Sequence, residues 1–212
     1  MTTAIRHPQL AARLVLADCG AAFSDQGRAA FKGMSAAAKE KGLGAIADVA
    51  MRRLFSPEFQ QQNPALTEAR KVRFLAVDPQ TFHGACEALA TLDLRPQLSG
   101  VTVPVLVLVG EQDEATPPPM SVELNAGLPN ARLVLLPGLA HVPQLQAPEV
   151  FLAARNNRTE RAMSTGLEHG DHRNDGEKYA GKQFGNFLHR TPRPARQWQT
   201  VVARQGKPGR QN

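Results

Sequence analysis

The strongest constraint on the fold is the run of β-branched and aliphatic residues from Val101 to Gly110, spelled VTVPVLVLVG. A continuous apolar run of this length is typical of a strand buried on both faces of a parallel sheet. Pro104 falls near its start, where a missing backbone donor does least harm. A helix is predicted over 120–128, a second strand over 131–136, and another helix from Pro148 to Ala154. Strands that alternate with helices predict a parallel α/β sheet with right-handed crossovers.

A shorter apolar run, ARLVLAD, lies near the start of the chain and ends at Asp18. It predicts another buried strand, preceded by the end of a helix over residues 3–7. The region 21–97 contains no strand-like run of comparable quality. Its apolar spacing instead predicts several helices, over residues 29–41, 43–55, 64–75 and 79–92.

Two titratable residues follow predicted strands at the points where functional groups gather in open α/β sheets. Asp113 comes shortly after the strand that ends near Gly110, and His141 comes shortly after the strand over 131–136. Neighbouring parallel strands lie about 4.8 Å apart, so side chains on the loops that follow them can meet. A carboxylate next to an imidazole fixes its tautomer and stabilises the imidazolium formed during proton transfer. We therefore expect Asp113 and His141 to form an acid–base pair.

The segments around these residues, VLVGEQDEATPP over 107–118 and LPGLAHVPQ over 136–144, resemble the last two catalytic-triad motifs of the α/β-hydrolase superfamily. The resemblance extends over about residues 3–154. Within the superfamily, RLFSPEF over 53–59 and ACEALATLDL over 85–94 are most similar to 3-oxoadipate enol-lactonases. The resemblance implies the C-terminal part of an α/β-hydrolase fold, that is, parallel strands with crossover helices, a helical cap insertion and a disordered basic tail.

The same resemblance implies hydrolysis of a small-molecule lactone or carboxylic ester, as in aromatic compound catabolism. His141 would be the general base and Asp113 would orient it; no metal and no organic cofactor is implied. It also divides the chain into a core fragment (1–20), a helical cap (21–97), a C-terminal core (98–154) and a tail (155–212).

The nucleophile that such a pair serves is missing, because no Gly-x-Ser-x-Gly elbow occurs in the sequence. Two segments come close to its spelling, around Ser35 (GMSAA) and around Cys86 (GACEA). An elbow must end a strand, however, and neither segment follows one, so both are expected on cap helices. We therefore expect the chain to be inactive alone, with the missing N-terminal half supplied elsewhere. The alternatives are a truncated or frame-shifted remnant without catalytic activity, and an interaction protein that uses its basic tail.

Charge is unevenly placed along the chain. The formal net charge is +6, but residues 155–212 hold 12 Lys and Arg against 5 Asp and Glu, so the preceding body is close to neutral. The tail has no periodicity that would build a core and no nucleic-acid-binding motif, so we expect it to be disordered and expect no nucleic-acid partner. No apolar run is long enough for a membrane helix, and the start lacks a signal-peptide pattern, which predicts a cytoplasmic protein.

Several other residues are weaker candidates. Arg52, Arg53 and Arg73 are each able to meet the carboxylate of an acidic lactone, but such residues are more often part of a solvated face. His83 is more simply explained as an ordinary cap residue. His169 and His172 have a metal-like spacing but no third or fourth ligand near them in the sequence.

Overall fold

A parallel sheet forms the centre of the molecule. The structure is a computed structural model that describes residues 1–164 and 201–202. Its strand order is β1-β2-β3-β4, and every neighbouring pair is parallel. The strands are β1 (Leu14–Ala17), β2 (Val105–Gly110), β3 (Ala131–Leu136) and β4 (Val201–Val202). The predicted α/β class is confirmed, and β2 and β3 are the two strongest strands expected from the sequence.

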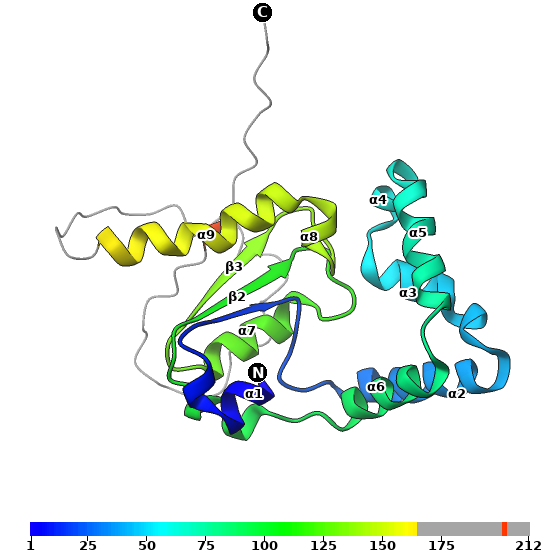
Figure 1. Cartoon of the computed structure of the whole chain (residues 1–212), viewed down its shortest axis with the longest axis horizontal. Coiled ribbons are helices and arrows are strands. Elements are labelled where there is room, and N and C mark those ends of the chain that lie inside the picture. The colour runs from blue at the N-terminus through cyan, green and yellow to red at the C-terminus, as the bar shows by residue number, and fades with distance from the viewer. Residues whose placement is uncertain (165–200, 203–212) are drawn as a thin grey trace, which may run out of the picture.

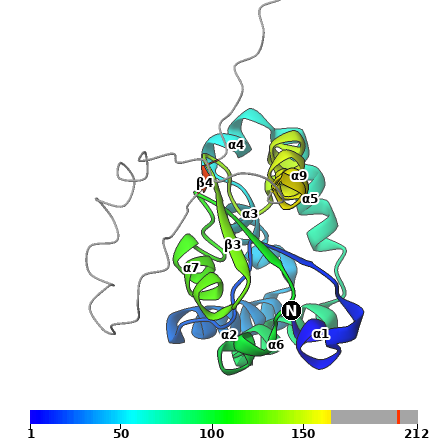
Figure 2. The same ribbon diagram turned by 90° about the vertical axis from the view of Figure 1, so that its left-hand side faces the viewer.

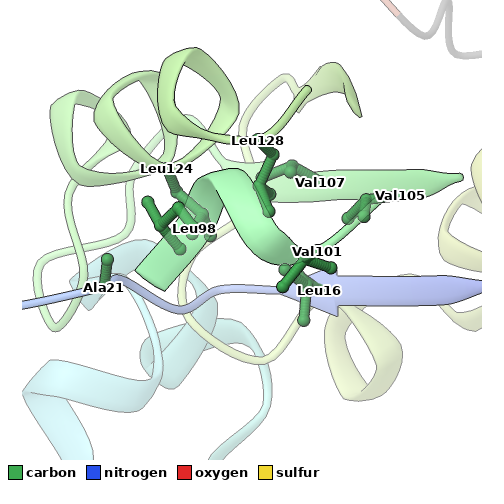
Figure 3. Packing of buried hydrophobic residues seen from close by; sticks show 8 residues of the cluster. All are labelled: Leu16, Ala21, Leu98, Val101, Val105, Val107, Leu124 and Leu128. Atoms are coloured by element: carbon green, nitrogen blue, oxygen red, sulfur yellow. The ribbon is translucent and has the colours of Figure 1, made fainter. Parts of the chain in front are cut away.

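Strand β2 is completely buried because helices cover both faces of the sheet. On one face, Val105 and Val107 contact a cluster that includes Leu98, Leu124 and Leu128 (Figure 3). This face is covered by α7 (Pro118–Gly127), by the 3₁₀ helix η3 (Arg95–Gly100), and by α1 (Thr2–Arg6), which the 3₁₀ helix η1 (Pro8–Leu10) follows. The alternation of side chains along a strand sends Leu106 and Leu108 to the opposite face.

The opposite face is covered by α8 (Pro143–Gln146) and α9 (Pro148–Ser164). Leu106, Leu108 and Leu136 pack there against Phe151 and Ala154 of α9. Figure 1 shows α9 and α7 on opposite sides of β2 and β3. Helix α9 continues beyond residue 154, where its apolar face ends, and thus enters the predicted tail. Strand β4 also lies in that tail and pairs with β3, whereas residues 165–200 and 203–212 lie outside the described part of the chain.

The segment between β1 and β2 is entirely helical, apart from its connections and one isolated bridge between Ala22 and Asp93. Helices α2 and α6 lie side by side, and α3, α4 and α5 extend away from them (Figures 1 and 2). The elements are α2 (Asp25–Lys41), the 3₁₀ helix η2 (Leu43–Ile46), α3 (Ala47–Leu54), α4 (Pro57–Gln62), α5 (Pro64–Leu75) and α6 (Pro79–Thr91). We call residues 25–91 the helical insertion.

Local signals explain where these helices begin. Ser24, Ser56 and Asp78 are N-cap residues whose side chains accept hydrogen bonds from backbone N–H groups of the first turn. Helix α4 was not expected from the sequence, although Ser56 followed by Pro57 is a typical helix start.

Arg28 ties the beginning of the helical insertion to its end. Its guanidinium donates to the carbonyl oxygens of Ala90 (2.8 Å) and Leu92 (3.1 Å), and its Nε donates to the Phe23 carbonyl (2.9 Å). One charged side chain thus satisfies three backbone acceptors where the chain enters and leaves the insertion.

We expect Arg28→Ala to lower the free energy of unfolding by about 2–3 kcal/mol, because it leaves partly buried carbonyls without their charged donor. Urea unfolding followed by circular dichroism measures this. Lys32→Ala, an exposed change on the same helix, is the control and is expected to alter stability by less than about 0.5 kcal/mol. Equal midpoints for the two variants would contradict the proposed role of Arg28.

Candidate functional site

The carboxyl ends of β2 and β3 bring Asp113 and His141 together. The His141 Nδ1 atom lies 3.0 Å from Asp113 Oδ2. The Asp113 side chain is fully buried, whereas the imidazole remains one-quarter exposed. The structure therefore places the two residues singled out in the sequence in direct contact, with the acid in the interior and the base toward solvent.

Asp113 is held by its own loop as well as by the imidazole. Its Oδ1 accepts hydrogen bonds from the backbone N–H groups of Ala115 (2.8 Å) and Thr116 (2.9 Å), and its Oδ2 accepts one from the Thr116 hydroxyl (2.8 Å). Burial alone would raise the pKa of Asp113, but the hydrogen bonds and the charge of His141, together with Thr116, hold it below its ordinary value. The arrangement keeps the carboxylate ionised beside the imidazole.

Thr116 is a site residue that the sequence reasoning missed. Its hydroxyl also lies 3.4 Å from His141 Nδ1, so it contacts both members of the pair. The local sequence could have pointed to it. An aspartate followed three residues later by a threonine often forms a turn in which the carboxylate accepts hydrogen bonds from backbone N–H groups.

Two hydrogen bonds join the two loops. The N–H of Gln112 donates to the Leu139 carbonyl (2.8 Å), and the N–H of Gly138 donates to Oε2 of the Glu111 side chain (2.9 Å). Gly110, the last residue of β2, lies against the loop that follows β3. A Cβ at this position would overlap the carbonyl oxygens of Leu139 and Ala140. The position of His141 relative to Asp113 is thus set by tight main-chain packing.

A third carboxyl lies at the same edge of the sheet, at the end of β1. Asp18 is buried and adopts a left-handed backbone conformation (φ 49°). Its Oδ1 accepts a hydrogen bond from the Gly110 N–H (2.9 Å), while its Oδ2 is buried with no hydrogen-bond partner among the described residues. Burial raises the pKa of Asp18 to about 7; the Gly110 hydrogen bond opposes that rise and the nearby Asp113 charge adds to it. From the sequence, Asp18 was recognised only as the end of a strand.

A hollow of about 680 Å³ lies between the helical insertion and the loop that carries Asp113. Arg52, Ser56 and Glu58 line it from the insertion, and Asp113 and Glu114 line it from the loop. A smaller hollow of about 190 Å³ continues toward the loop after β3, where Gly138 and Leu139 lie. Helix α4 and the strand-end loops therefore form the walls of a cleft beside the acid–base pair.

The three arginines considered from the sequence have different surroundings. Arg52 lines the larger hollow. Arg53 instead donates to the Ala115 carbonyl (3.2 Å), and its guanidinium lies 5.6 Å from the centre of the Phe31 ring. Arg73 is exposed on α5. Only Arg52 among the three lines this hollow.

The two substitute nucleophiles lie inside helices, as expected. Ser35 is buried in α2, where its hydroxyl contacts Nδ1 of His83 from α6. Cys86 is buried in α6, and burial raises the pKa of its thiol. His83 thus belongs to the packing of α2 against α6.

Within residues 1–156, no cluster of three His, Cys, Asp or Glu side chains is arranged to hold a metal ion. His169 and His172 lie outside the described residues. None of the helices described is both long and apolar enough to cross a membrane.

The comparisons with known proteins agree with this geometry. The chain is 28% identical over 148 residues to 3-oxoadipate enol-lactonase 2 from Acinetobacter baylyi. The aligned residues make up 70% of this chain and 54% of that protein. It is 40% identical over 75 residues to a pimeloyl-[acyl-carrier protein] methyl ester esterase from Nitrosomonas europaea, covering 35% of this chain and 30% of the esterase. The chain therefore spans about half the length, or less, of these relatives.

Solved structures give the same result. The enol-lactonase from Burkholderia xenovorans LB400 superposes with a TM-score of 0.69 at 25% identity, covering 76% of this chain and 60% of that chain. The model of the alpha/beta hydrolase family matches residues 2–154, which include every strand and loop of the candidate site. The chain belongs to the α/β-hydrolase family, whose members among its relatives hydrolyse esters and lactones.

Proposed function

We propose that this chain supplies the acid–base half of a hydrolase that cleaves a lactone or carboxylic ester. The observation that carries the proposal is the contact between His141 Nδ1 and the buried Asp113 carboxylate at 3.0 Å, on loops that end adjacent parallel strands. Asp113 fixes the tautomer in which Nδ1 carries the proton, so that the other ring nitrogen is free to accept one.

In this proposal His141 takes a proton from a serine hydroxyl as that serine attacks the ester carbonyl, and gives it to the leaving alcohol. It then activates water to release the acid. Asp113 stays ionised and stabilises the imidazolium that forms. No elbow serine occurs in the sequence, so a segment that carries one is required in addition to this chain.

Strand β1 offers the place where such a segment would dock. It stands at the edge of the described sheet, and Val15 on it is 45% exposed. An exposed apolar edge strand is a ready template for another strand. A strand paired there in parallel would end beside Asp18, Asp113 and His141, which is where the nucleophile must be.

The larger hollow defines the proposed substrate class more closely. The helical insertion, with its connections over 21–97, would act as the cap, and Arg52 would meet a carboxylate on the acyl or lactone group. This favours a small acidic lactone, similar to the substrate named for the enol-lactonase relatives, and hence a role in aromatic compound catabolism. The free cysteines Cys19 and Cys86 agree with the proposed cytoplasmic location.

Complementation tests the proposal directly. The N-terminal part of the Acinetobacter baylyi enol-lactonase, with its elbow serine, is fused in front of this chain, and hydrolysis of p-nitrophenyl acetate and of 3-oxoadipate enol-lactone is measured. We expect no turnover by the chain alone and turnover by the fusion that depends on both the elbow serine and His141.

The control is the same fusion with the elbow serine replaced by alanine. Ester hydrolysis by the isolated chain that survives His141→Ala would contradict the proposal. So would a folded fusion, verified by circular dichroism, that turns over neither substrate; the chain would then be a non-catalytic remnant of the family.

A further inference from the structure

Asp18 is a buried acid that the proposed mechanism does not use. It ends β1, it is 8% exposed, and its backbone adopts the left-handed region, which few residues with a side chain occupy. Aspartate tolerates that conformation better than most residues. A strained backbone and a buried carboxyl at one position suggest that the carboxyl is needed there.

The carboxyl connects β1 to the loop that carries Asp113. Its Oδ1 accepts the Gly110 N–H at 2.9 Å, and Gly110 is the residue packed against the loop that carries His141. Asp18 therefore contacts the backbone at a residue that packs between the loop carrying Asp113 and the loop carrying His141.

The second oxygen, Oδ2, is buried and has no hydrogen-bond partner in the part of the chain that the structure describes. The titratable groups that act on Asp18 are Asp113 from the loop after β2, His141 from the loop after β3, and the neighbouring Cys19. An ionised Oδ2 would place a second negative charge beside Asp113 without a donor to stabilise it, whereas a protonated Oδ2 removes that charge and becomes a donor itself.

We propose that Asp18 is a positioning residue of the Asp113–His141 pair, which fixes Gly110 through one carboxyl oxygen and carries a proton on the other. The inference rests on the proposed function, since it assumes that Asp113 and His141 act as an acid–base pair. It adds that a neutral carboxyl behind the pair keeps the negative charge on Asp113 alone, so the imidazole interacts with a single carboxylate.

The first test is the pH dependence of stability in the full chain. Because burial raises the pKa of Asp18 to about 7 from an ordinary value of 3.8, the native state holds a proton that the unfolded state releases. The free energy of unfolding therefore falls as the pH rises from about 4 to 7, because the unfolded state releases this proton and the native state keeps it. We expect Asp18→Asn to remove that loss, so that its urea midpoint exceeds that of the wild type by about 1 M at pH 8 and matches it near pH 4.

The second test reports on positioning rather than stability. The ring resonances of His141 and the amide resonance of Gly110 are followed by NMR in the full chain, in Asp18→Asn and in Asp18→Ala. We expect the His141 ring resonances to keep their wild-type positions in Asp18→Asn, which mimics the protonated carboxyl, and to shift in Asp18→Ala, where the Gly110 N–H loses its acceptor. The Gly110 amide resonance should persist in Asp18→Asn, which keeps an acceptor, and shift in Asp18→Ala.

Glu87→Gln is the matched control, because it removes an exposed carboxylate on α6, in the helical insertion, and should leave both readouts unchanged. Asp113→Asn separates this inference from the proposed function: His141 ring resonances that do not respond to Asp113→Asn would show that the two residues do not form the acid–base pair. His141 ring resonances and a Gly110 amide resonance that are the same in the wild type, Asp18→Asn and Asp18→Ala would overturn the role of Asp18 while leaving the pair intact.

Discussion

Gly110→Ala is expected to lower the free energy of unfolding by at least about 3 kcal/mol and to separate Asp113 from His141. The added Cβ would overlap the carbonyl oxygens of Leu139 and Ala140, which are main-chain atoms and cannot rotate away. Relief requires that β2 and the loop after β3 move apart, and this movement breaks the hydrogen bond from Gln112 to Leu139. Urea unfolding measures the loss of stability, and a shift of the His141 ring resonances in the NMR spectrum measures the loss of contact with Asp113.

Gly84→Ala is the matched control for this substitution. Gly84 lies inside α6, and a Cβ there would meet no atom within 4 Å. Alanine is the better helix former by about 0.5–1 kcal/mol, so the control should gain stability where Gly110→Ala loses it. Equal urea midpoints for the wild type and Gly110→Ala would show that the two loops are not packed as described.

Strands β2 and β3 could be predicted because a strand that is buried on both faces of a sheet consists almost entirely of apolar residues. Every residue of β2 from Val105 to Gly110 is buried, and no polar side chain interrupts the run. The second strand, β3, was predicted with the bounds that it has in the structure, residues 131–136. Asp113 and His141 closely follow these two strands, so their contact could be expected from their spacing together with the resemblance of both loops to α/β-hydrolase motifs.

The helix boundaries were less predictable, for two physical reasons. Helix α4 is short and begins soon after α3 ends, and Phe55, whose ring stacks on Phe59 of α4, was assigned to the end of the preceding helix. Helix α9 continues to Ser164 although its apolar face ends near Ala154. Residues such as Ala, Arg and Glu have enough intrinsic helix propensity to extend a helix that packing has already started.

The role of Asp18 could not be predicted because it depends on contacts between distant parts of the chain. The carboxyl meets Gly110, 92 residues further along, and lies near Asp113 only because β1 and β2 are adjacent. Thr116 is different, since its contacts with Asp113 are local and its spacing in the sequence was visible. The Asp113–His141 pair and its local loop contacts could therefore be predicted from the sequence. The role of Asp18 could be recognised only once the order of the strands in the sheet was known.

Asp113→Asn is expected to reduce kcat of the reconstituted hydrolase, the fusion described above, by about 10⁴-fold with little change in KM. Asparagine keeps the shape of the side chain and can still accept the N–H groups of Ala115 and Thr116. Its amide is neutral, however, and it no longer fixes the His141 tautomer or stabilises the imidazolium. The loss therefore falls on the transition state, in which the imidazole is charged, and steady-state kinetics on p-nitrophenyl acetate measure it.

Thr116→Val separates this charge effect from loop packing. It removes the hydroxyl that donates to Asp113 Oδ2 and leaves the carboxylate in contact with His141, so we expect a decrease in kcat of only about tenfold.

Asp113→Asn should also change the dependence of stability on pH in the acid range. The pKa of Asp113 is held low in the native state, so the carboxylate contributes stability above its ordinary pKa, and this contribution is lost as the pH falls through the native value. Asp113→Asn should remove that acid-side loss of stability; a variant that kept both the wild-type kcat and the wild-type acid limb would show that Asp113 does not act on His141.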